Sequence, residues 1–347
     1  MTTKIDGFAL VALIGLALFS LFNLLGISFQ FFLNQFTFFI VGFIALFLTL
    51  KLGIKNVQIN ARLIYLSFIG LLIITFIVGD VVRGSRRWID LVFFNFQASE
   101  FLKPFFIIFL ADFFSKSKIS TRSVLISFAY FLLIFVIIVK QPDLGNALLY
   151  LGVFAGMVFF AGLTARYYMY AFILSIITSP ILWKLLKDYQ KNRILSFLNP
   201  QIDTSGISYN LIQSIITVGS GGLFGRGLGL GTQSRFLFLP ENHTDFAYAA
   251  LVEQFGFIGG LAVIILYAIL FYRLLLVLRS VRDNPFHFMY VSGVLLFLAT
   301  SFTVNIGMNM GLFPITGIAL PFVSYGGSSV VSTMIMVGLA LSLNLPR

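Results

Sequence analysis

The sequence predicts an all-α polytopic membrane protein. Of its 347 residues, 59% are hydrophobic and only 10% are charged, whereas soluble domains average about 25% charged residues. Apolar runs of about 20 residues recur along the chain, and each is long enough to cross a hydrocarbon layer of about 30 Å as a helix. The runs are continuous rather than alternating, which favours helices over a transmembrane barrel.

Ten hydrophobic segments are expected to cross the membrane. They are residues 8–25, 34–52, 62–79, 97–114, 123–140, 144–162, 168–186, 246–272, 287–310 and 323–343. The chain is therefore expected to form a single transmembrane domain over residues 1–347, with a large loop at 187–245 between the seventh and eighth spans.

The basic residues predict the orientation of these spans. Placing the N-terminus in the cytoplasm puts 12 of the 23 basic residues on cytoplasmic segments, as the positive-inside rule requires. These residues are Lys4, Lys51, Lys55, Arg62, Lys116, Lys118, Arg122, Arg166, Arg273, Arg279, Arg282 and Arg347. Ten spans return the C-terminus to the cytoplasm and place the large loop outside it.

Composition also excludes several functional classes. The chain has no cysteine, so disulfides and thiol chemistry are excluded. Its net charge of +11 is explained by basic side chains at helix ends that set topology and contact anionic lipid, so we expect no nucleic-acid partner. The first apolar run follows Lys4 without a small-residue cleavage site, and we interpret it as a retained span rather than a signal peptide.

The short outer loop "GDVVRGSRRWIDLVFFNF" opposes the orientation rule. Arg83, Arg86 and Arg87 all lie in this loop, on the side where short loops are normally poor in basic residues. A binding site for an anion, such as a lipid phosphate, would account for them.

The loop at 187–245 is too long for a simple connection, and such loops are usually functional. The stretch "YNLIQSIITVG" spaces its apolar residues for a short amphipathic helix at the membrane interface. Seven glycines follow between Gly219 and Gly231, without the Lys-Ser/Thr of a nucleotide-binding loop. They predict either a re-entrant segment packed on the helices or backbone N–H groups that bind a phosphate.

Ionisable and amide side chains also lie inside the predicted spans. Gln97, Glu100 and Lys103 share one helix face, where they either bind substrate or form a self-neutralising pair that only joins helices. Asn305 and Asn309 share a face of the ninth span and are expected to hydrogen-bond between helices.

Two helix starts carry acidic residues. In "KQPDLGNA", Asp143 is expected at a helix start, where it complements the macrodipole. The stretch "LPENHTDFAYAALVEQFG" concentrates Glu241, His243, Asp245 and Glu253 at the outer membrane boundary. Its spacing is also typical of an Asn cap followed by a first-turn acid, with Glu253 buried deeper on nearly the same side.

These segments together resemble a known family. The motifs are "RGSRRWIDL", "FQASEFLK", "KQPDLGNALL", "LPENHTDFAYAALVEQFGFIGG" and "NIGMNMGLFPITGIALPFVSYGGSS". In this order they are similar to the SEDS proteins (shape, elongation, division and sporulation), the polymerases of bacterial cell-wall peptidoglycan, over nearly the whole chain. The short N-terminus and "DYQKNRILSFLNP" resemble the RodA branch more than the FtsW branch.

The resemblance implies a ten-helix glycosyltransferase of the bacterial cytoplasmic membrane that acts on lipid II and nascent glycan. It implies a class B penicillin-binding protein as transpeptidase partner, together with other elongation-complex proteins. The family's essential acid falls on Asp245, its Arg-Trp pair on Arg87 and Trp88, and its polar helix motif on Gln97, Glu100 and Lys103. Ala98 stands where the family usually has proline, which changes the start of this helix and leaves its polar face intact.

The chemistry implied by the resemblance is an inverting displacement of undecaprenyl pyrophosphate by a sugar hydroxyl. It needs a base and positive charge for the leaving group. The roles we expect are base for Asp245, pyrophosphate binding for Arg86, Arg87 and Lys103, orientation of Lys103 by Glu100, and sugar or lipid packing for Trp88. Glu241 and His243 are further candidates for substrate binding. A divalent cation, Mg²⁺ or Mn²⁺, is a further expectation, with Asp245, Glu241 and His243 as candidate ligands.

Two alternatives come from other functional classes. A lipid II flippase or transporter also fits ten spans with intramembrane charges, although no internal repeat is visible. A scaffold that only recruits the transpeptidase would not need Asp245. Within the family, a division-specific FtsW-like role is the alternative to elongation and rod shape.

Overall fold

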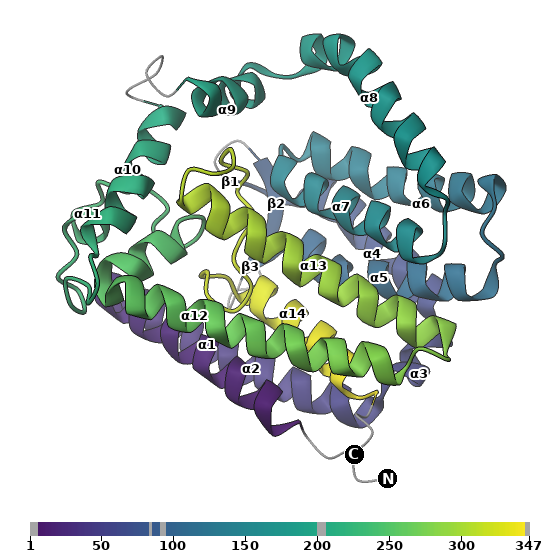
Figure 1. Ribbon diagram of the computed structural model, residues 1–347, viewed down its shortest axis with the longest axis horizontal. Coiled ribbons are helices and arrows are strands. Elements are labelled where there is room, and N and C mark those ends of the chain that lie inside the picture. Colours follow the sequence, from purple (N-terminus) through teal and green to yellow (C-terminus); the bar gives the residue numbers. More distant parts are fainter. Residues whose placement is uncertain (1–5, 83–84, 91–94, 200–205, 344–347) are drawn as a thin grey trace.

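The computed structural model describes residues 6–82, 85–90, 95–199 and 206–343. They form a helical bundle that includes a small antiparallel sheet (Figure 1). Each of the ten predicted segments falls on a helix. These helices are α1 (Gly7–Ile27), α2 (Phe29–Leu52), α4 (Ala61–Val78), α5 (Ala98–Lys116), α6 (Thr121–Lys140), α7 (Leu144–Phe160), α8 (Ala165–Leu185), α12 (Ala247–Ser280), α13 (Pro285–Asn309) and α14 (Gly327–Leu341). The remaining helices are α3 (Ile54–Gln58), α9 (Asp188–Leu198), α10 (Ile207–Ser220) and α11 (Thr232–Arg235).

The bundle has the dimensions of a multi-pass membrane protein. Six helices are long and apolar enough to cross a bilayer, namely α1, α2, α4, α6, α12 and α13. Their outward side chains are large and apolar, such as Phe8, Leu63 and Ile77, which are 63–68% exposed. A surface of this kind is stable against lipid and not against water.

Helix α5 lies at the centre of the bundle. It packs against α4, α13 and α14, and its buried side chains include Leu102, Phe106 and Leu110. On one side of the bundle α14 packs on α2, and α12 lies along α1 (Figure 1). The polar start of α5 is therefore surrounded by helices that come from both halves of the chain.

Residues 80–96 contradict the all-α expectation. They contain three short antiparallel strands in the order β1 (Asp80–Val82), β2 (Ser85–Asp90) and β3 (Asn95–Phe96). Val81 pairs with Arg86, and Ile89 pairs with Phe96. Pairing between the strands satisfies backbone N–H and C=O groups of this loop. Arg83 lies outside the described residues.

The described part of the large loop contains three helices, α9, α10 and α11. The predicted amphipathic helix is confirmed as α10. In Figure 1, α8, α9 and α10 form an arch along one edge of the bundle. Helix α9 consists of the segment "DYQKNRILSFL" and packs against α10. It carries Arg193, for which the sequence predicted no role.

Helix α12 is broken at Gly256, which has φ +71° and ψ −172°. Like the broken spans of transporters, it needs partners for the backbone groups that the break releases. The glycine-rich segment supplies them through four backbone hydrogen bonds: Arg226 N–H to Glu253 C=O, Gly227 N–H to Gln254 C=O, Phe257 N–H to Gly222 C=O and Ile258 N–H to Leu223 C=O, at 2.8–3.2 Å. The glycines therefore pack on a helix, one of the two possibilities that the sequence left open.

Replacing Gly256 with alanine is expected to destabilise the protein. A Cβ at this position would lie 2.3 Å from the Gly225 nitrogen and the Leu223 oxygen, and its backbone φ is left-handed. We expect the free energy of unfolding to fall by about 1–3 kcal/mol, measured by thermal unfolding in detergent. The matched control is Gly219→Ala, because a Cβ there meets no atom within 4 Å. Equal stability of the two variants would contradict this prediction.

Candidate functional site

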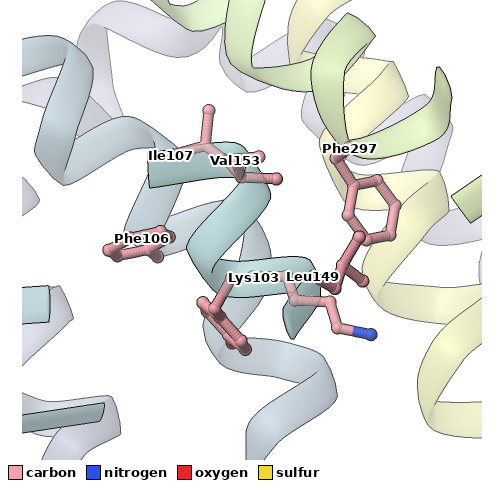
Figure 2. A pocket seen from close by; sticks show the side chains of 7 residues that line it. Lys103, Phe106, Ile107, Leu149, Val153 and Phe297 are labelled. Atoms are coloured by element: carbon pink, nitrogen blue, oxygen red, sulfur yellow. The ribbon is translucent and has the colours of Figure 1, made fainter. Parts of the chain in front are cut away.

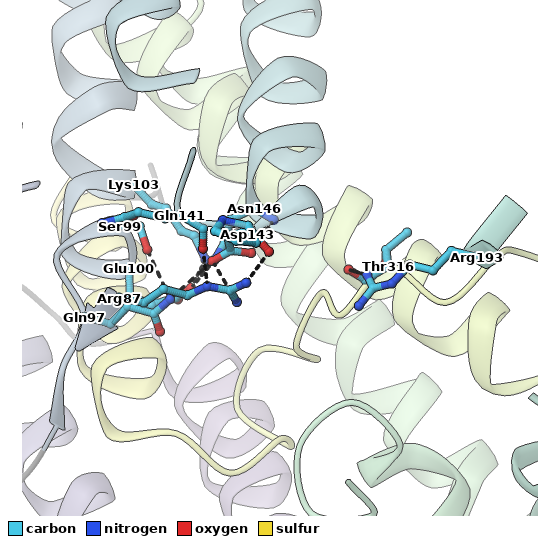
Figure 3. Close-up of polar contacts among 11 residues, drawn as sticks. Arg87, Gln97, Ser99, Glu100, Lys103, Gln141, Asp143, Asn146, Arg193 and Thr316 are labelled. Atoms are coloured by element: carbon cyan, nitrogen blue, oxygen red, sulfur yellow. Dashed lines mark hydrogen bonds and ion pairs between the residues drawn. The ribbon is translucent and has the colours of Figure 1, made fainter. Parts of the chain in front are cut away.

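A first set of polar contacts surrounds the side chain of Arg87 on β2. Its Nε donates to the Gln141 carbonyl at 2.8 Å, and its Nη2 donates to the Pro142 carbonyl. Its Nη1 lies 3.6 Å from a carboxylate oxygen of Asp143, the N-cap of α7 (Figure 3). Arg87 therefore fastens the turn between α6 and α7 to β2. The sequence predicts Asp143 only as a helix-start residue, and its pairing with Arg87 is a finding of the structure.

Buried polar residues at the start of α5 extend this group. Lys103 Nζ lies 2.6 Å from Glu100 Oε1, and Asn146 Nδ2 donates to Glu100 at 3.2 Å and to Asp143 at 2.9 Å. Gln97 Nε2 lies 3.5 Å from Asp143 Oδ2. We call these residues the α5–α7 polar cluster: Arg87, Gln97, Glu100, Lys103, Asp143 and Asn146. Two cations and two carboxylates compensate one another in it, which makes their burial tolerable.

One carboxylate oxygen of the α5–α7 polar cluster accepts no hydrogen bond from the described residues. Glu100 Oε2 is buried and, among the described residues, has no hydrogen-bond partner. An unmatched buried acceptor of this kind needs a water, an ion or a ligand group as its partner. The Glu100 carboxylate therefore has capacity to accept one more hydrogen bond, which is compatible with the functional interpretation of the Glu100–Lys103 pair.

Lys103 also borders a small pocket between α5, α7 and α13 (Figure 2). Apart from Lys103, the lining consists of Phe106, Ile107, Leu149, Tyr150, Val153 and Phe297. Its cavity volume is only about 10 Å³, far below the roughly 300 Å³ at which ligand pockets begin. The Lys103 amino group lies 5.4 Å from the centre of the Phe297 ring. Its immediate partners are thus Glu100 and an aromatic face.

Arg86 and Arg87 have different surroundings because successive side chains of a strand point to opposite faces. Arg86 is exposed and donates to the Ile77 carbonyl at 3.3 Å, so it lies outside the α5–α7 polar cluster. Trp88 is half-buried, and its backbone pairs with Asp80 of β1. Of the outer-loop residues predicted to bind substrate, only Arg87 joins the cluster.

Asp245 lies just after a tight turn. Glu241 has a left-handed backbone with φ +52°, and its carbonyl accepts from the N–H groups of Thr244 and Phe246, both at 3.1 Å. The Glu241 carboxylate accepts from the Thr244 hydroxyl at 2.9 Å. Glu241 therefore shapes the turn that presents Asp245.

The predicted cap of this helix is wrong. Helix α12 begins at Ala247 with Phe246 as N-cap and without a side-chain cap bond. Asn242 instead donates to the Ser234 carbonyl at 2.7 Å. Asp245 precedes the cap and is not a first-turn acid, so its carboxylate is held apart from the helix.

His243 belongs to an aromatic group. Its ring stacks on Phe31 of α2 with the centroids 4.4 Å apart and lies edge-on to Tyr325 at 5.8 Å. Its carbonyl accepts from the Tyr325 N–H at 2.8 Å. These contacts tie the turn to α2 and to the segment that precedes α14.

Glu253 is buried, as expected, and anchors the large loop. Its carboxylate accepts from the N–H groups of Gln233 and Ser234 at 2.8 and 3.0 Å and from the Ser234 hydroxyl at 2.7 Å. Because the Ser234 carbonyl in turn accepts from Asn242, Glu253 fixes α11 beneath the turn that presents Asp245.

Arg193 of α9 is a functional candidate that sequence reasoning missed. Its Nη1 donates to the Thr316 carbonyl at 2.9 Å (Figure 3). A Cβ placed on Gly317 would lie 3.9 Å from Arg193 Nη1 and 3.5 Å from Asp245 Oδ2, so both charged groups border Gly317. The signal was present in the motif "DYQKNRILSFLNP", whose only arginine is Arg193.

The electrostatic surroundings of Asp245 raise its pKa. Burial has the largest effect, and the negative charge of Glu241 adds to it. Arg193 and, more weakly, Arg87 oppose this shift, and together these effects bring the pKa of the Asp245 carboxyl from 3.8 to about 6. Asp245 is half-buried, so it combines a perturbed pKa with access to a ligand, as catalytic carboxylates do.

The predicted metal ligands do not fit a metal site. Within the described part of the chain, no three His, Asp or Glu side chains are grouped to hold an ion. The Glu241 carboxylate accepts from Thr244, and the His243 ring stacks on Phe31. We therefore assign no catalytic step to a bound metal.

Comparisons with known proteins agree on one family. The sequence profile of the FtsW, RodA and SpoVE cell cycle proteins matches residues 2–346. Stage V sporulation protein E of Bacillus subtilis is 36% identical over 91% of this chain and 87% of that protein. The peptidoglycan glycosyltransferase MrdB of Escherichia coli K12 is 36% identical over 83% of this chain and 78% of that protein.

Solved structures share the fold. A chain from a study of polymerization and crosslinking by a peptidoglycan synthase complex superposes with a TM-score of 0.84, at 26% identity over 97% of both chains. The rod shape determining protein RodA of Thermus thermophilus superposes with a TM-score of 0.74, at 24% identity over 98% of this chain and 97% of that one. The arrangement of helices is therefore a known one.

Proposed function

This chain belongs to the family of FtsW, RodA and SpoVE cell cycle proteins, and from that premise we propose that it is a peptidoglycan glycosyltransferase that polymerises lipid II. The observation that carries the proposal is the Asp245 carboxylate, which is half-buried, has a pKa raised to about 6, and borders Gly317 together with the Arg193 guanidinium. Such a carboxylate is ionised at neutral pH and still accepts a proton readily. The name of the E. coli relative supports the same activity.

In the proposed reaction, Asp245 is the general base. It takes the proton of the attacking sugar hydroxyl as the oxygen forms a bond to the anomeric carbon of the donor. The bond from that carbon to the pyrophosphate oxygen breaks, and undecaprenyl pyrophosphate leaves with the electron pair. A single displacement of this kind inverts the anomeric configuration and needs one base.

Positive charge near Asp245 stabilises the leaving pyrophosphate. Arg193 and Arg87 are the two cations that act on the Asp245 carboxyl, and a guanidinium presents several N–H donors to phosphate oxygens. Arg87 keeps its position through Gln141, Pro142 and Asp143. Preorganised donors of this kind lower the barrier because they need no rearrangement during the reaction.

The remaining residues of the α5–α7 polar cluster have supporting roles in the proposal. Lys103 holds the Glu100 carboxylate in place through their contact at 2.6 Å. Glu100 Oε2, which lacks a partner in the described part of the chain, accepts a hydroxyl of the substrate. Gln97 steadies the Asp143 carboxylate. Trp88 packs against a sugar or the lipid at the interface.

The setting of this activity is part of the proposal. The reaction takes place on the outer face of the bacterial cytoplasmic membrane, in a ten-span topology with both termini inside. A class B penicillin-binding protein crosslinks the nascent glycan, and the fold shared with a chain from a synthase complex that coordinates polymerization and crosslinking supports such a partner. The motif that contains Arg193 supports an elongation role. A need for Mg²⁺ or Mn²⁺ stays a prediction, which polymerisation with and without a chelator checks.

The pH dependence of polymerisation tests the role of Asp245. Because the base must be ionised and its pKa is about 6, the rate is expected to rise as pH increases through about 6 and to level off above it. Glu241→Gln removes a charge that raises this pKa, so its midpoint should move to lower pH. Arg193→Gln removes a charge that lowers it, so its midpoint should move to higher pH. A midpoint that moves in neither variant contradicts the assignment.

A further inference from the structure

The N–H of Ala249 lies in the first turn of α12 and has no partner within the helix, as is usual for the first N–H groups of an α-helix. If α12 began one residue earlier, with Asp245 as its N-cap, this N–H would donate to the carbonyl of Asp245. Here the Ala249 N–H donates instead to Oδ1 of Asn309 at 3.0 Å, and Nδ2 of Asn309 donates to the Asp245 carbonyl at 3.1 Å. One side-chain amide from α13 is thus inserted between the two groups and satisfies both.

The inserted amide is held in place by a second one. Asn305, one turn earlier on α13, donates to the Asp245 carbonyl at 3.1 Å and to the Ile318 carbonyl at 2.8 Å. Asn309 Nδ2 also donates to the Asn305 carbonyl at 2.8 Å. Both asparagines are fully buried. The Asp245 carbonyl therefore receives two donors from α13 and none from its own helix.

The neighbours of Asp245 are fixed by other contacts. The Phe246 N–H donates to the Glu241 carbonyl at 3.1 Å, and the Ala250 N–H donates to the Phe246 carbonyl at 3.1 Å. The Thr244 carbonyl accepts from the Ser324 hydroxyl at 2.7 Å. In this turn, the Asp245 carbonyl is thus the backbone group whose partners come from α13, and one of them is Asn309.

We infer that Asn309, supported by Asn305, is a positioning residue for the Asp245 carboxylate. The inference rests on the proposed function, in which Asp245 is the base. Without the amide, the buried Ala249 N–H has lost its acceptor, and the Asp245 carbonyl keeps only the donor from Asn305. The simplest remedy is for the Ala249 N–H to donate to the Asp245 carbonyl. That bond moves the start of α12 back by one residue, makes Asp245 its N-cap, and draws the Asp245 side chain away from the position at which it faces Gly317 and Arg193.

Asn309→Ala is the first variant to test, with purified lipid II as the substrate. We expect kcat to fall by about 10–100-fold, because displacement of a reacting group by about 1 Å can cost 10²-fold. KM should stay close to that of the wild type, since no substrate contact is removed. The acid limb of the pH–rate profile should move, because the displaced carboxylate changes its distances from Arg193, Glu241 and the N-terminus of α12.

Asn309→Gln supplies the conservative comparison. Glutamine keeps the amide NH₂ and carbonyl on a side chain longer by one methylene. It should recover part of kcat relative to alanine and return the pH profile toward that of the wild type. Asn305→Ala removes only the second donor and should give a smaller loss of kcat. These two variants carry the test if Asn309→Ala does not yield folded protein in size-exclusion chromatography.

Tyr290→Phe is the matched structural control. Tyr290 is fully buried on the same helix, and its hydroxyl donates to the Met336 carbonyl of α14 at 2.9 Å. It lies 19 residues from Asn309, which is about 28 Å at roughly 1.5 Å per residue. Loss of this bond should lower thermal stability while kcat and the pH profile stay unchanged.

The results separate the inference from the proposed function. Suppose that Asp245→Asn is inactive. The inference is then overturned if folded Asn309→Ala has the wild-type kcat and pH profile. If Asn309→Ala does not fold, the same result in both Asn309→Gln and Asn305→Ala overturns it. Wild-type activity of Asp245→Asn overturns the proposed function instead. A fall in kcat as large in Tyr290→Phe as in Asn309→Ala reduces Asn309 to a structural role and also overturns the inference.

Discussion

Asp245→Asn is expected to lower kcat for lipid II polymerisation by about 10²–10⁴-fold, the contribution typical of a general base. Asparagine has nearly the same size and keeps the backbone contacts of Asp245 to Asn305 and Asn309. It cannot accept the proton of the attacking hydroxyl. The measurement is the initial rate of glycan formation by the purified protein at saturating lipid II. KM should change little, because the lost interaction is with the transition state.

The control for this variant is Asp188→Asn. Asp188 belongs to the same large loop, its side chain is 99% exposed, and its only ion pair among the described residues is with Lys191 at 4.0 Å. Removal of this charge should leave polymerisation unchanged. A loss of activity in the control comparable to that of Asp245→Asn would mean that the loop responds to any loss of negative charge.

Arg87→Ala has the second largest expected effect, a loss of about 10²–10³-fold in kcat, as for removal of one preorganised donor from an active site. Two consequences combine in this variant. The leaving pyrophosphate loses a nearby cation, and the Asp143 carboxylate, which is 8% exposed, loses its ion-pair partner. Arg87→Lys should restore little activity, because one ammonium group cannot reproduce the three contacts of the guanidinium.

Two further variants distinguish between these two consequences of the Arg87→Ala change. Arg86→Ala changes the neighbouring arginine, which is exposed on the other face of β2, and should keep nearly full activity. The double variant Arg87→Ala with Asp143→Asn removes the unpaired acid as well. If Arg87 serves the leaving group, the double variant stays slow. Recovery of the wild-type rate would instead assign Arg87 a role limited to neutralising Asp143.

The helices could be predicted from the sequence because they depend on local hydrophobic runs. The strands at 80–96 could not, because their stability comes from pairing between segments with little periodicity of their own. The break at Gly256 was also invisible. A lone glycine in an apolar run is compatible with a continuous helix, and the glycine-rich segment that satisfies the break lies about 30 residues earlier.

In the candidate site, too, local motifs could be predicted from the sequence, whereas contacts between distant segments could not. The resemblance placed Asp245, Arg87 and the polar face of α5 by motif, and the structure supplies their partners. Asp143 is 56 residues from Arg87, and Thr316 is 123 residues from Arg193. The error at the start of α12 has this origin too: a local cap rule assigned Asn242, while the group that satisfies Ala249 is Asn309, 60 residues away.

The claim that Asp245 carries glycan polymerisation is tested most directly in proteoliposomes that contain labelled lipid II. Both lengthened glycan and translocated lipid II are measured, for the wild type and for Asp245→Asn. We predict that the wild type forms glycan without moving intact lipid II across the bilayer, and that Asp245→Asn forms almost none. Translocation without glycan would identify a transporter, and equal glycan formation by both proteins would contradict the assignment of Asp245 as the base.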